Sequence, residues 1–169
     1  MEIVLTGVNV GDFGKSTGES LGQLLESLTK VNGLQRLRLS SIEPNLVTDR
    51  IIDIISEGKV LLPHFHMPLQ SGNDRVLGLM RRRYRREVFR DRVMKIRERI
   101  PDAGLGADVI VGFPGETEEE YADTYTFLES LPLSYLHVFA YSPRPGTPAA
   151  EMPGAVNRQE KEKRSRQLI

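Results

Sequence analysis

Five polar side chains stand where predicted strands end, and together they suit the binding of a polar ligand: Asn9, Glu43, Gln70, Asp108 and Tyr141. Carboxylates such as Glu43 and Asp108 accept hydrogen bonds from ammonium or hydroxyl groups, whereas an amide or a phenol both donates and accepts. In parallel α/β folds the carboxyl ends of the strands form one rim, where ligands bind. We therefore expect these side chains to converge on one site.

The composition limits the chemistry that this site can perform by itself. None of the 169 residues is cysteine, which excludes disulfides, thiolate catalysis and a cysteine-ligated metal or iron–sulfur centre within the chain. The 23 basic and 23 acidic residues cancel, so no global basic field marks a nucleic-acid-binding protein. No apolar run approaches the roughly 20 residues that span a bilayer, and the first residues lack the segments of a signal peptide. We predict a cytoplasmic protein.

The stretch Ala107 to Glu120, A-D-V-I-V-G-F-P-G-E-T-E-E-E, organises the rest of the chain. Its short β-branched run predicts a strand that is buried on both faces. Gly112-Phe113-Pro114-Gly115 breaks the strand, and Thr117 with Glu120 forms a capping box that opens a helix. Glycines in such a turn let a flat ligand approach the backbone, although ordinary strand–turn–helix connections use them too.

Strands and helices alternate along the sequence. Strands are predicted at residues 2–8, 34–39, 64–69, 109–111 and 135–141. Helices are predicted after a Ser16–Glu19 capping box, from Thr48 to Gly58, after Asn73, from 89 to 100, after Thr117, and at 157–168.

This order, βα repeated four times and then a final strand, requires parallel strands with right-handed crossovers. Five such strands build an open doubly wound sheet or part of a barrel. No Gly-x-Gly-x-x-Gly follows the first strand, which argues against a dinucleotide-binding fold. The short, regular strands favour an α/β fold that forms a partial TIM-like barrel.

Several motifs carry a family resemblance over nearly the whole chain. D-V-I-V-G-F-P-G-E-T resembles the adenine-contacting strand of radical S-adenosylmethionine (SAM) enzymes, and P-L-Q-S-G-N-D with M-R-R-R-Y resembles their fourth strand and following helix. L-R-L-S-S-I-E-P-N, H-M-P-L-Q-S-G-N-D and H-V-F-A-Y-S-P-R-P-G-T-P-A are together similar to the methylthiotransferases. The S-S-I-E-P version points to the branch that acts on N6-threonylcarbamoyladenosine in tRNA.

The resemblance implies a radical mechanism in which cofactors carry the chemistry and the protein orients them. A reduced four-iron cluster splits SAM to a 5′-deoxyadenosyl radical, which takes a hydrogen from C2 of the adenosine. A second four-iron cluster helps to install the sulfur, and a further SAM supplies the methyl group. The implied macromolecular partner is tRNA.

The resemblance also implies which residues surround SAM. Gly7 lies where the family binds the methionine end, and Glu43 holds an acidic position that accepts from the methionine ammonium or the ribose hydroxyls. Arg82 matches an arginine that pairs with the methionine carboxylate, a bidentate task that suits a guanidinium. Gln70 and Asp108 match residues near the ribose. From the sequence alone, Gln70 is equally consistent with a turn residue ahead of a helix cap, whereas an exposed loop glutamate before Pro44 is the less favoured interpretation of Glu43.

The adenine side of the pocket is implied at the turn after the fourth strand. Phe113 to Gly115 would offer backbone to the base, and Tyr141 completes the rim. We expect no catalytic side chain and no metal ligand in this chain.

Two further groups of residues have open interpretations. His64 and His66 alternate on one strand face and favour a hydrogen-bonded interior role over metal binding, because two imidazoles without further ligands are weak evidence for a metal. The Arg81–Arg86 run with Tyr84 suits RNA phosphates and a stacked base, although most charge runs are solvated faces.

The sequence departs from the family in what it lacks. The family holds its catalytic cluster in a C-x3-C-x2-C loop after a strand that would precede Glu2, and it has an amino-terminal cluster domain and a carboxyl-terminal RNA-binding domain. We expect a fragment in which residues 1–155 form the partial barrel and residues 156–169 a charged helix that leads toward the RNA-binding domain. Such a fragment would be inactive alone, and its first strand would leave an exposed edge through which it could self-associate.

Three alternatives belong to other functional classes. One is a methylthiotransferase that acts on a ribosomal protein or another modified adenosine. Another is a non-catalytic module that binds nucleotide or RNA. The third is a phosphate-binding barrel enzyme, which would need a glycine-rich loop late in the chain, where residues 143–148 are instead rich in proline.

Overall fold

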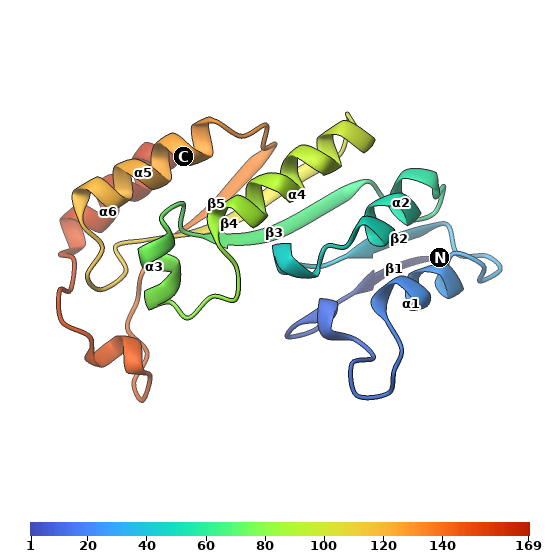
Figure 1. Ribbon diagram of the computed structural model, residues 1–169, viewed down its shortest axis with the longest axis horizontal. Coiled ribbons are helices and arrows are strands. Elements are labelled where there is room, and N and C mark those ends of the chain that lie inside the picture. Colours follow the sequence, from blue (N-terminus) through green and yellow to red (C-terminus); the bar gives the residue numbers. More distant parts are fainter.

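The computed structural model describes all residues, 1–169, as an elongated α/β arc with β1 and α6 at opposite ends (Figure 1). The strands are β1 (Glu2–Leu5), β2 (Arg36–Leu39), β3 (His64–Gln70), β4 (Gly104–Val111) and β5 (Tyr135–Ala140). The α-helices are α1 (Leu21–Leu28), α2 (Asp49–Glu57), α3 (Asp74–Leu79), α4 (Arg86–Arg99), α5 (Glu118–Glu129) and α6 (Arg158–Leu168). Short 3-10 helices span Val10–Asp12, Pro44–Leu46 and Pro148–Glu151.

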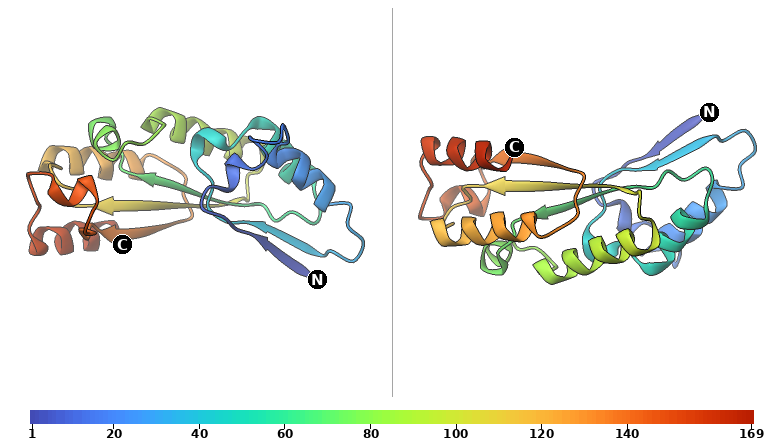
Figure 2. Two further views of the ribbon diagram at one scale, coloured as in Figure 1. Left: turned by 90° about the horizontal axis from the view of Figure 1, so that it is seen from below. Right: turned by 90° about the horizontal axis from the view of Figure 1, so that it is seen from above.

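All strand pairs are parallel, in chain order, and the arc does not close. β1 pairs with β2, and β4 lies between β3 and β5 in a second sheet. The two sheets meet where Leu37 bridges to Leu61 and where the Ile42 amide donates to the His66 carbonyl, at 3.0 Å. Figure 2 shows the two sheets splayed at an angle to each other. The predicted partial barrel is confirmed in its strand order and direction.

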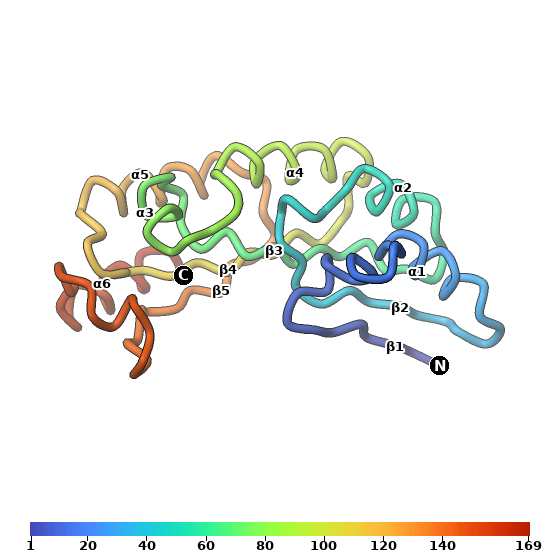
Figure 3. Tube along the Cα trace, turned by 60° about the horizontal axis from the view of Figure 1, so that its bottom comes forward, coloured from blue at the N-terminus to red at the C-terminus, as the bar shows by residue number.

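Helices cover one side of the strands, and the core lies between the two layers. Figure 3 shows α1, α2, α4 and α5 along that side. Side chains alternate along a strand, so every second residue of β3 and β4 is buried under the helices: Phe65, Met67, Leu69, Leu105, Ala107, Val109 and Val111. Phe89, Val93 and Ile96 of α4 meet them. The opposite side of these strands is the interior of the arc.

The predicted helix starts are correct where an Asx or hydroxyl side chain reaches the backbone. Thr48, Asn73 and Asn157 each accept hydrogen bonds from amides two or three residues ahead. The Thr117–Glu120 capping box forms in both directions.

Two predicted boundaries at the amino-terminal end are wrong. The helix predicted after Ser16 begins at Leu21, because Gly14 and Gly18 adopt positive φ and turn the chain; Ser20 is its N-cap instead. The strand predicted over residues 2–8 ends at Leu5, because β2 offers it only four paired residues. Val8 is consequently fully exposed in the following loop.

The carboxyl-terminal helix is present as predicted, and it packs on the arc beside β5. The Tyr121 hydroxyl of α5 donates to the Arg164 carbonyl of α6, at 3.0 Å. Arg164 itself is only 4% exposed, and Leu168 packs against the hydrophobic core. None of the helices has the length and apolar character that crossing a bilayer requires.

Candidate functional site

Polar and aromatic side chains line the interior face of β3, β4 and β5. The parallel register pairs Asp108 of β4 with Pro68 on one side and His137 on the other. Because alternate residues share a face, these strands bring His64, His66, Gln70, Asp108, Ile110, Tyr135, His137 and Phe139 toward the interior of the arc. The carboxyl end of this face is where the predicted site residues gather.

A cavity of about 580 Å³ opens at that end, and four predicted ligand-binding residues line it: Gln70, Arg82, Asp108 and Tyr141. The wall also includes Ile110, Phe139, Ser142 and Arg144. A second cavity of about 530 Å³ adjoins the first, because both contain Arg82, Ile110 and Tyr141; Phe113 lines this second part. The size lies within the range of roughly 300–1,000 Å³ that small-molecule sites occupy.

Several polar atoms in these walls, and one on Glu43 beside them, lack partners within the protein. Six buried side-chain N or O atoms have no hydrogen bond, and four of them are Glu43 Oε2, Gln70 Oε1, Arg82 Nε and the Tyr141 hydroxyl. All four belong to predicted site residues. Unsatisfied buried polar atoms are costly and rare in native proteins, so a cluster of them at one cavity indicates a polar ligand.

The backbone at Gln70 is strained. Its φ is +70°, a conformation that non-glycine residues seldom adopt, and the β3–β4 register shifts between Pro68 and Gln70. Arg81 is the other non-glycine residue with positive φ, at +55°, and it lines the second cavity. Strain of this kind costs on the order of 1–3 kcal/mol and concentrates at functional sites.

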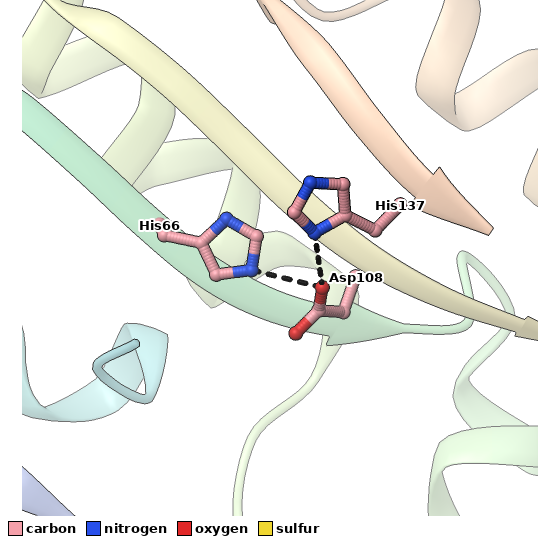
Figure 4. Close-up of side chains that lie close together, drawn as sticks. All are labelled: His66, Asp108 and His137. Atoms are coloured by element: carbon pink, nitrogen blue, oxygen red, sulfur yellow. Dashed lines mark hydrogen bonds and ion pairs between the residues drawn. The ribbon is translucent and has the colours of Figure 1, made fainter. Parts of the chain in front are cut away.

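Asp108 is held from both sides by imidazoles (Figure 4). Its Oδ1 lies 2.8 Å from Nε2 of His66 and 3.3 Å from Nδ1 of His137. Burial alone would raise the pKa of Asp108, but the His66 hydrogen bond and the neighbouring imidazoles outweigh burial and lower it. Both contacts use Oδ1, which leaves Oδ2 for a ligand in the cavity.

The Tyr135 hydroxyl joins the two histidines of β3, as predicted for a hydrogen-bonded interior role. It lies 2.8 Å from Nε2 of His64 and 3.1 Å from Nδ1 of His66. Burial lowers the pKa of His64, helped by repulsion from Arg38 and His66. Gly106 provides the space for this ring, since a Cβ atom there would lie 2.1 Å from Cζ of Tyr135.

Gly106→Ala is therefore expected to lower the free energy of unfolding by about 1–3 kcal/mol, because the added methyl group forces the Tyr135 ring away from both histidines. Chemical denaturation measures the loss. Gly78→Ala in α3 is the matched control: nothing lies within 4 Å of its added Cβ, so it should be neutral or stabilising. Equal effects of the two variants would contradict the steric argument.

The turn after β4 closes one end of the second cavity. Phe113 is 5% exposed and meets the Tyr141 ring edge to face, with 5.2 Å between centroids. The Gly115 amide donates a hydrogen bond to the Gly154 carbonyl, and the Gly115 carbonyl accepts one from the Arg75 guanidinium. The aromatic pair thus faces the cavity, whereas the polar backbone groups of Gly115 are occupied within the protein.

Three remaining predicted site residues, Glu43, Gly7 and Asn9, lie outside the cavity linings, and Asn9 instead donates to Asp12 at 2.7 Å. Glu43 stands beside the site, with Oε1 3.9 Å from Nη1 of Arg82. Gly7 lies in the exposed loop after β1, and only backbone atoms of Val10 come within 4 Å of a Cβ built there. The structure thus groups Glu43 with Arg82, whereas Gly7 is not part of either cavity lining.

Comparison with known families decides what kind of barrel this is. The family model of the radical SAM superfamily matches residues 4–128, which cover β1 to α5. This chain belongs to the radical SAM superfamily. The family resemblance predicted from the motifs is confirmed.

Curated radical SAM relatives match along the full chain. The threonylcarbamoyladenosine tRNA methylthiotransferase MtaB of Bacillus subtilis is 45% identical over 170 residues, which cover 99% of this chain and 38% of the relative. A tRNA-2-methylthio-N(6)-dimethylallyladenosine synthase of Thermobifida fusca is 44% identical, covering 100% of this chain and 35% of the relative. The chain spans little more than a third of the length of these relatives.

Solved radical SAM structures share the fold. Coproporphyrinogen III oxidase (HemN) of Escherichia coli superposes with a TM-score of 0.75 at 21% identity, over 99% of this chain and 39% of that one. The radical SAM methyltransferase TsrM of Kitasatospora setae gives a TM-score of 0.70 at 18% identity, over 88% of this chain and 29% of that one. At such low identity the likeness concerns the fold alone.

One expectation for this radical SAM chain is wrong. Tyr84 cannot stack on an RNA base, because it is 5% exposed and its hydroxyl donates to the Pro68 carbonyl at 2.5 Å. Burial raises the pKa of this phenol. Its role is to fix β3 against the arginine-rich loop that carries Arg82.

Sequence analysis missed two features of the radical SAM core that long-range contacts create. His137 joins Asp108 only through the β4–β5 register. Glu116, 1% exposed in its side chain, pairs with Arg164 at 2.7 Å and accepts from the Gly112 amide at 2.6 Å. The only available signal for that pair was a lone glutamate inside a turn and an arginine in a charged helix.

Proposed function

We propose that this chain is part of a radical SAM methylthiotransferase that modifies C2 of N6-threonylcarbamoyladenosine in tRNA, and that its cavity binds SAM. The observation that carries the proposal is the set of unsatisfied polar atoms on Gln70, Arg82 and Tyr141, which line the cavity, and on Glu43, which lies beside Arg82. SAM has the matching groups: a carboxylate, an ammonium, two ribose hydroxyls and a flat purine. The similarity of this chain, over nearly all of its residues, to part of the curated tRNA methylthiotransferases supports the reaction class.

Each proposed contact follows from the chemistry of a side chain. The Arg82 guanidinium would pair with the carboxylate of the ligand, and Glu43, next to it, would accept from the ammonium. Gln70 Oε1 and Asp108 Oδ2 would accept from the ribose hydroxyls. The Phe113–Tyr141 pair offers an apolar wall to the adenine.

The reactive chemistry belongs to the cofactors, and the chain orients them. When bound, SAM and a reduced four-iron cluster supply a carbon radical that removes a hydrogen atom from the substrate. This chain has no cysteine, so thiolate ligands for either four-iron cluster would lie outside these 169 residues. The role of the chain is to hold SAM by its polar ends and to shield the reacting face from water with Ile110 and Phe139.

Two aspects of the proposal concern the substrate and the compartment. The S-S-I-E-P motif at 40–44 favours the threonylcarbamoyladenosine branch, while relatives named for dimethylallyladenosine match equally well. The proposed partner is tRNA and the proposed compartment the cytoplasm. Self-association through β1 remains a prediction, in line with its pairing on one edge only.

Mass spectrometry of tRNA nucleosides tests the function. Deleting the gene that encodes this chain is expected to remove 2-methylthio-N6-threonylcarbamoyladenosine from total tRNA, and complementation is expected to restore it. Loss of the dimethylallyl counterpart instead would move the enzyme to the other branch. If both nucleosides persist while a ribosomal protein loses a methylthio group, the tRNA assignment is wrong.

A further inference from the structure

All three histidines of the chain lie on the interior face of the second sheet, and two of them converge on one carboxylate. His66 comes from β3, Asp108 from β4 and His137 from β5, so three neighbouring strands each supply one side chain. One ligand-type atom of each lies within 4.8 Å of the others. Because the strands are hydrogen-bonded in fixed register, this grouping is held by the sheet and not by a mobile loop.

The spacing suits a single metal ion. Two ligand atoms that each lie about 2.1 Å from one ion are separated by about 3–3.4 Å. The observed separation between Oδ1 of Asp108 and Nδ1 of His137 is 3.3 Å, whereas Nε2 of His66 lies at hydrogen-bond distance from that oxygen, 2.8 Å, and would move away by a few tenths of an ångström when an ion enters. A set of two imidazole nitrogens and one carboxylate oxygen binds divalent transition cations in preference to Mg²⁺ or Ca²⁺.

An outer partner orients the most buried ligand. Histidines that bind metals usually donate their second ring N–H to another group, which fixes the tautomer. Here Nδ1 of His66 lies 3.1 Å from the Tyr135 hydroxyl, which also contacts His64 at 2.8 Å. With an ion bound, Nε2 of His66 would lose the proton that it donates to Asp108, Nδ1–H would donate to the Tyr135 hydroxyl, and that hydroxyl would donate to His64.

The remaining coordination positions are accessible. The side chain of His137 is 55% exposed, whereas those of Asp108 and His66 are 21% and 11% exposed. An ion can therefore enter from the interior of the arc and keep water or a ligand in its open positions. We propose that His66, Asp108 and His137 bind one divalent transition cation such as Zn²⁺. The inference does not rest on the proposed function.

Calorimetric titration of the chain with Zn²⁺, after treatment with a chelator, tests the site. Since the chain has no cysteine, thiolates cannot compete for the ion. One Zn²⁺ per chain is expected to bind, and His66→Ala or His137→Ala is expected to weaken binding at least about 100-fold, more than the loss of an outer partner costs. His64→Ala is the matched control, because His64 contacts only Tyr135 in this cluster, and it should change affinity less than about threefold.

The visible absorption spectrum of bound Co²⁺ distinguishes direct coordination of the ion from non-specific binding. Co²⁺ bound by two imidazoles and a carboxylate has visible absorption bands, which should vanish in His137→Ala. This exposed residue can be replaced without loss of the fold, which thermal denaturation verifies. The proposal is overturned if Zn²⁺ does not bind to the wild-type chain, if His64→Ala weakens binding as much as His66→Ala, or if His137→Ala keeps the Co²⁺ spectrum.

Discussion

Replacing Arg164 with alanine is expected to lower the free energy of unfolding by about 3–5 kcal/mol, because it leaves a buried carboxylate without its partner. Glu116 is 1% exposed in its side chain and has only Arg164 and the Gly112 amide as partners. Arg164 also reaches Glu118 at 3.0 Å and Glu160 at 3.2 Å. Removing it therefore disrupts the contact between α6 and the turn after β4.

Arg158→Ala in the same helix is the matched control for this measurement. Arg158 is 89% exposed and pairs only with Glu162 one turn along, so its loss should leave the stability nearly unchanged. Denaturant unfolding of both variants gives the comparison. A double variant, Arg164→Met with Glu116→Leu, should recover most of the stability, since a buried ion pair replaced by apolar groups is often neutral. Similar losses for Arg164→Ala and Arg158→Ala would show that the pair is energetically unimportant.

Arg82→Ala is expected to weaken SAM binding by the complete enzyme by roughly 30-fold or more, and to remove the methylthio group from tRNA. The physical reason is that a guanidinium paired with a carboxylate away from water contributes on the order of 2 kcal/mol or more to binding. Arg82 lines both parts of the cavity, and its Nε has no partner inside the protein. Equilibrium binding of SAM and nucleoside mass spectrometry measure the two effects.

Two variants sharpen the interpretation of this loss. Arg83→Ala removes the next arginine, which is 71% exposed and outside the cavity, and it should leave SAM affinity unchanged. Arg82→Lys keeps the charge but not the fork of donors, so it should recover only part of the affinity. If Arg82→Ala binds SAM as tightly as the wild type does, the cavity assignment is incorrect even where the methylthiotransferase assignment holds.

The sequence by itself determined the elements and the family. Short apolar runs located every strand, and helical spacing with capping residues located every α-helix, because these signals depend on neighbouring residues alone. The βα alternation determined parallel strands, and the motifs around Gln70, Asp108 and Phe113 led to the radical SAM superfamily. Prediction failed at the amino-terminal loop, where Gly14 and Gly18 adopt positive φ and turn the chain, so that the helix begins after Ser20.

The tertiary structure decided which of these residues meet. Tyr84 lies within a run of arginines, which predicts an exposed side chain, yet it is buried in the structure. Burial depends on which distant residues pack against a side chain, and the local sequence does not show them. The pairs Glu116–Arg164 and Asp108–His137 lie 48 and 29 positions apart, and strand register and helix docking alone bring them together. The spacing of neighbouring residues determines helices and strands. A site is formed by contacts between elements that are distant in the sequence, and the geometry of these contacts exists only in the folded chain.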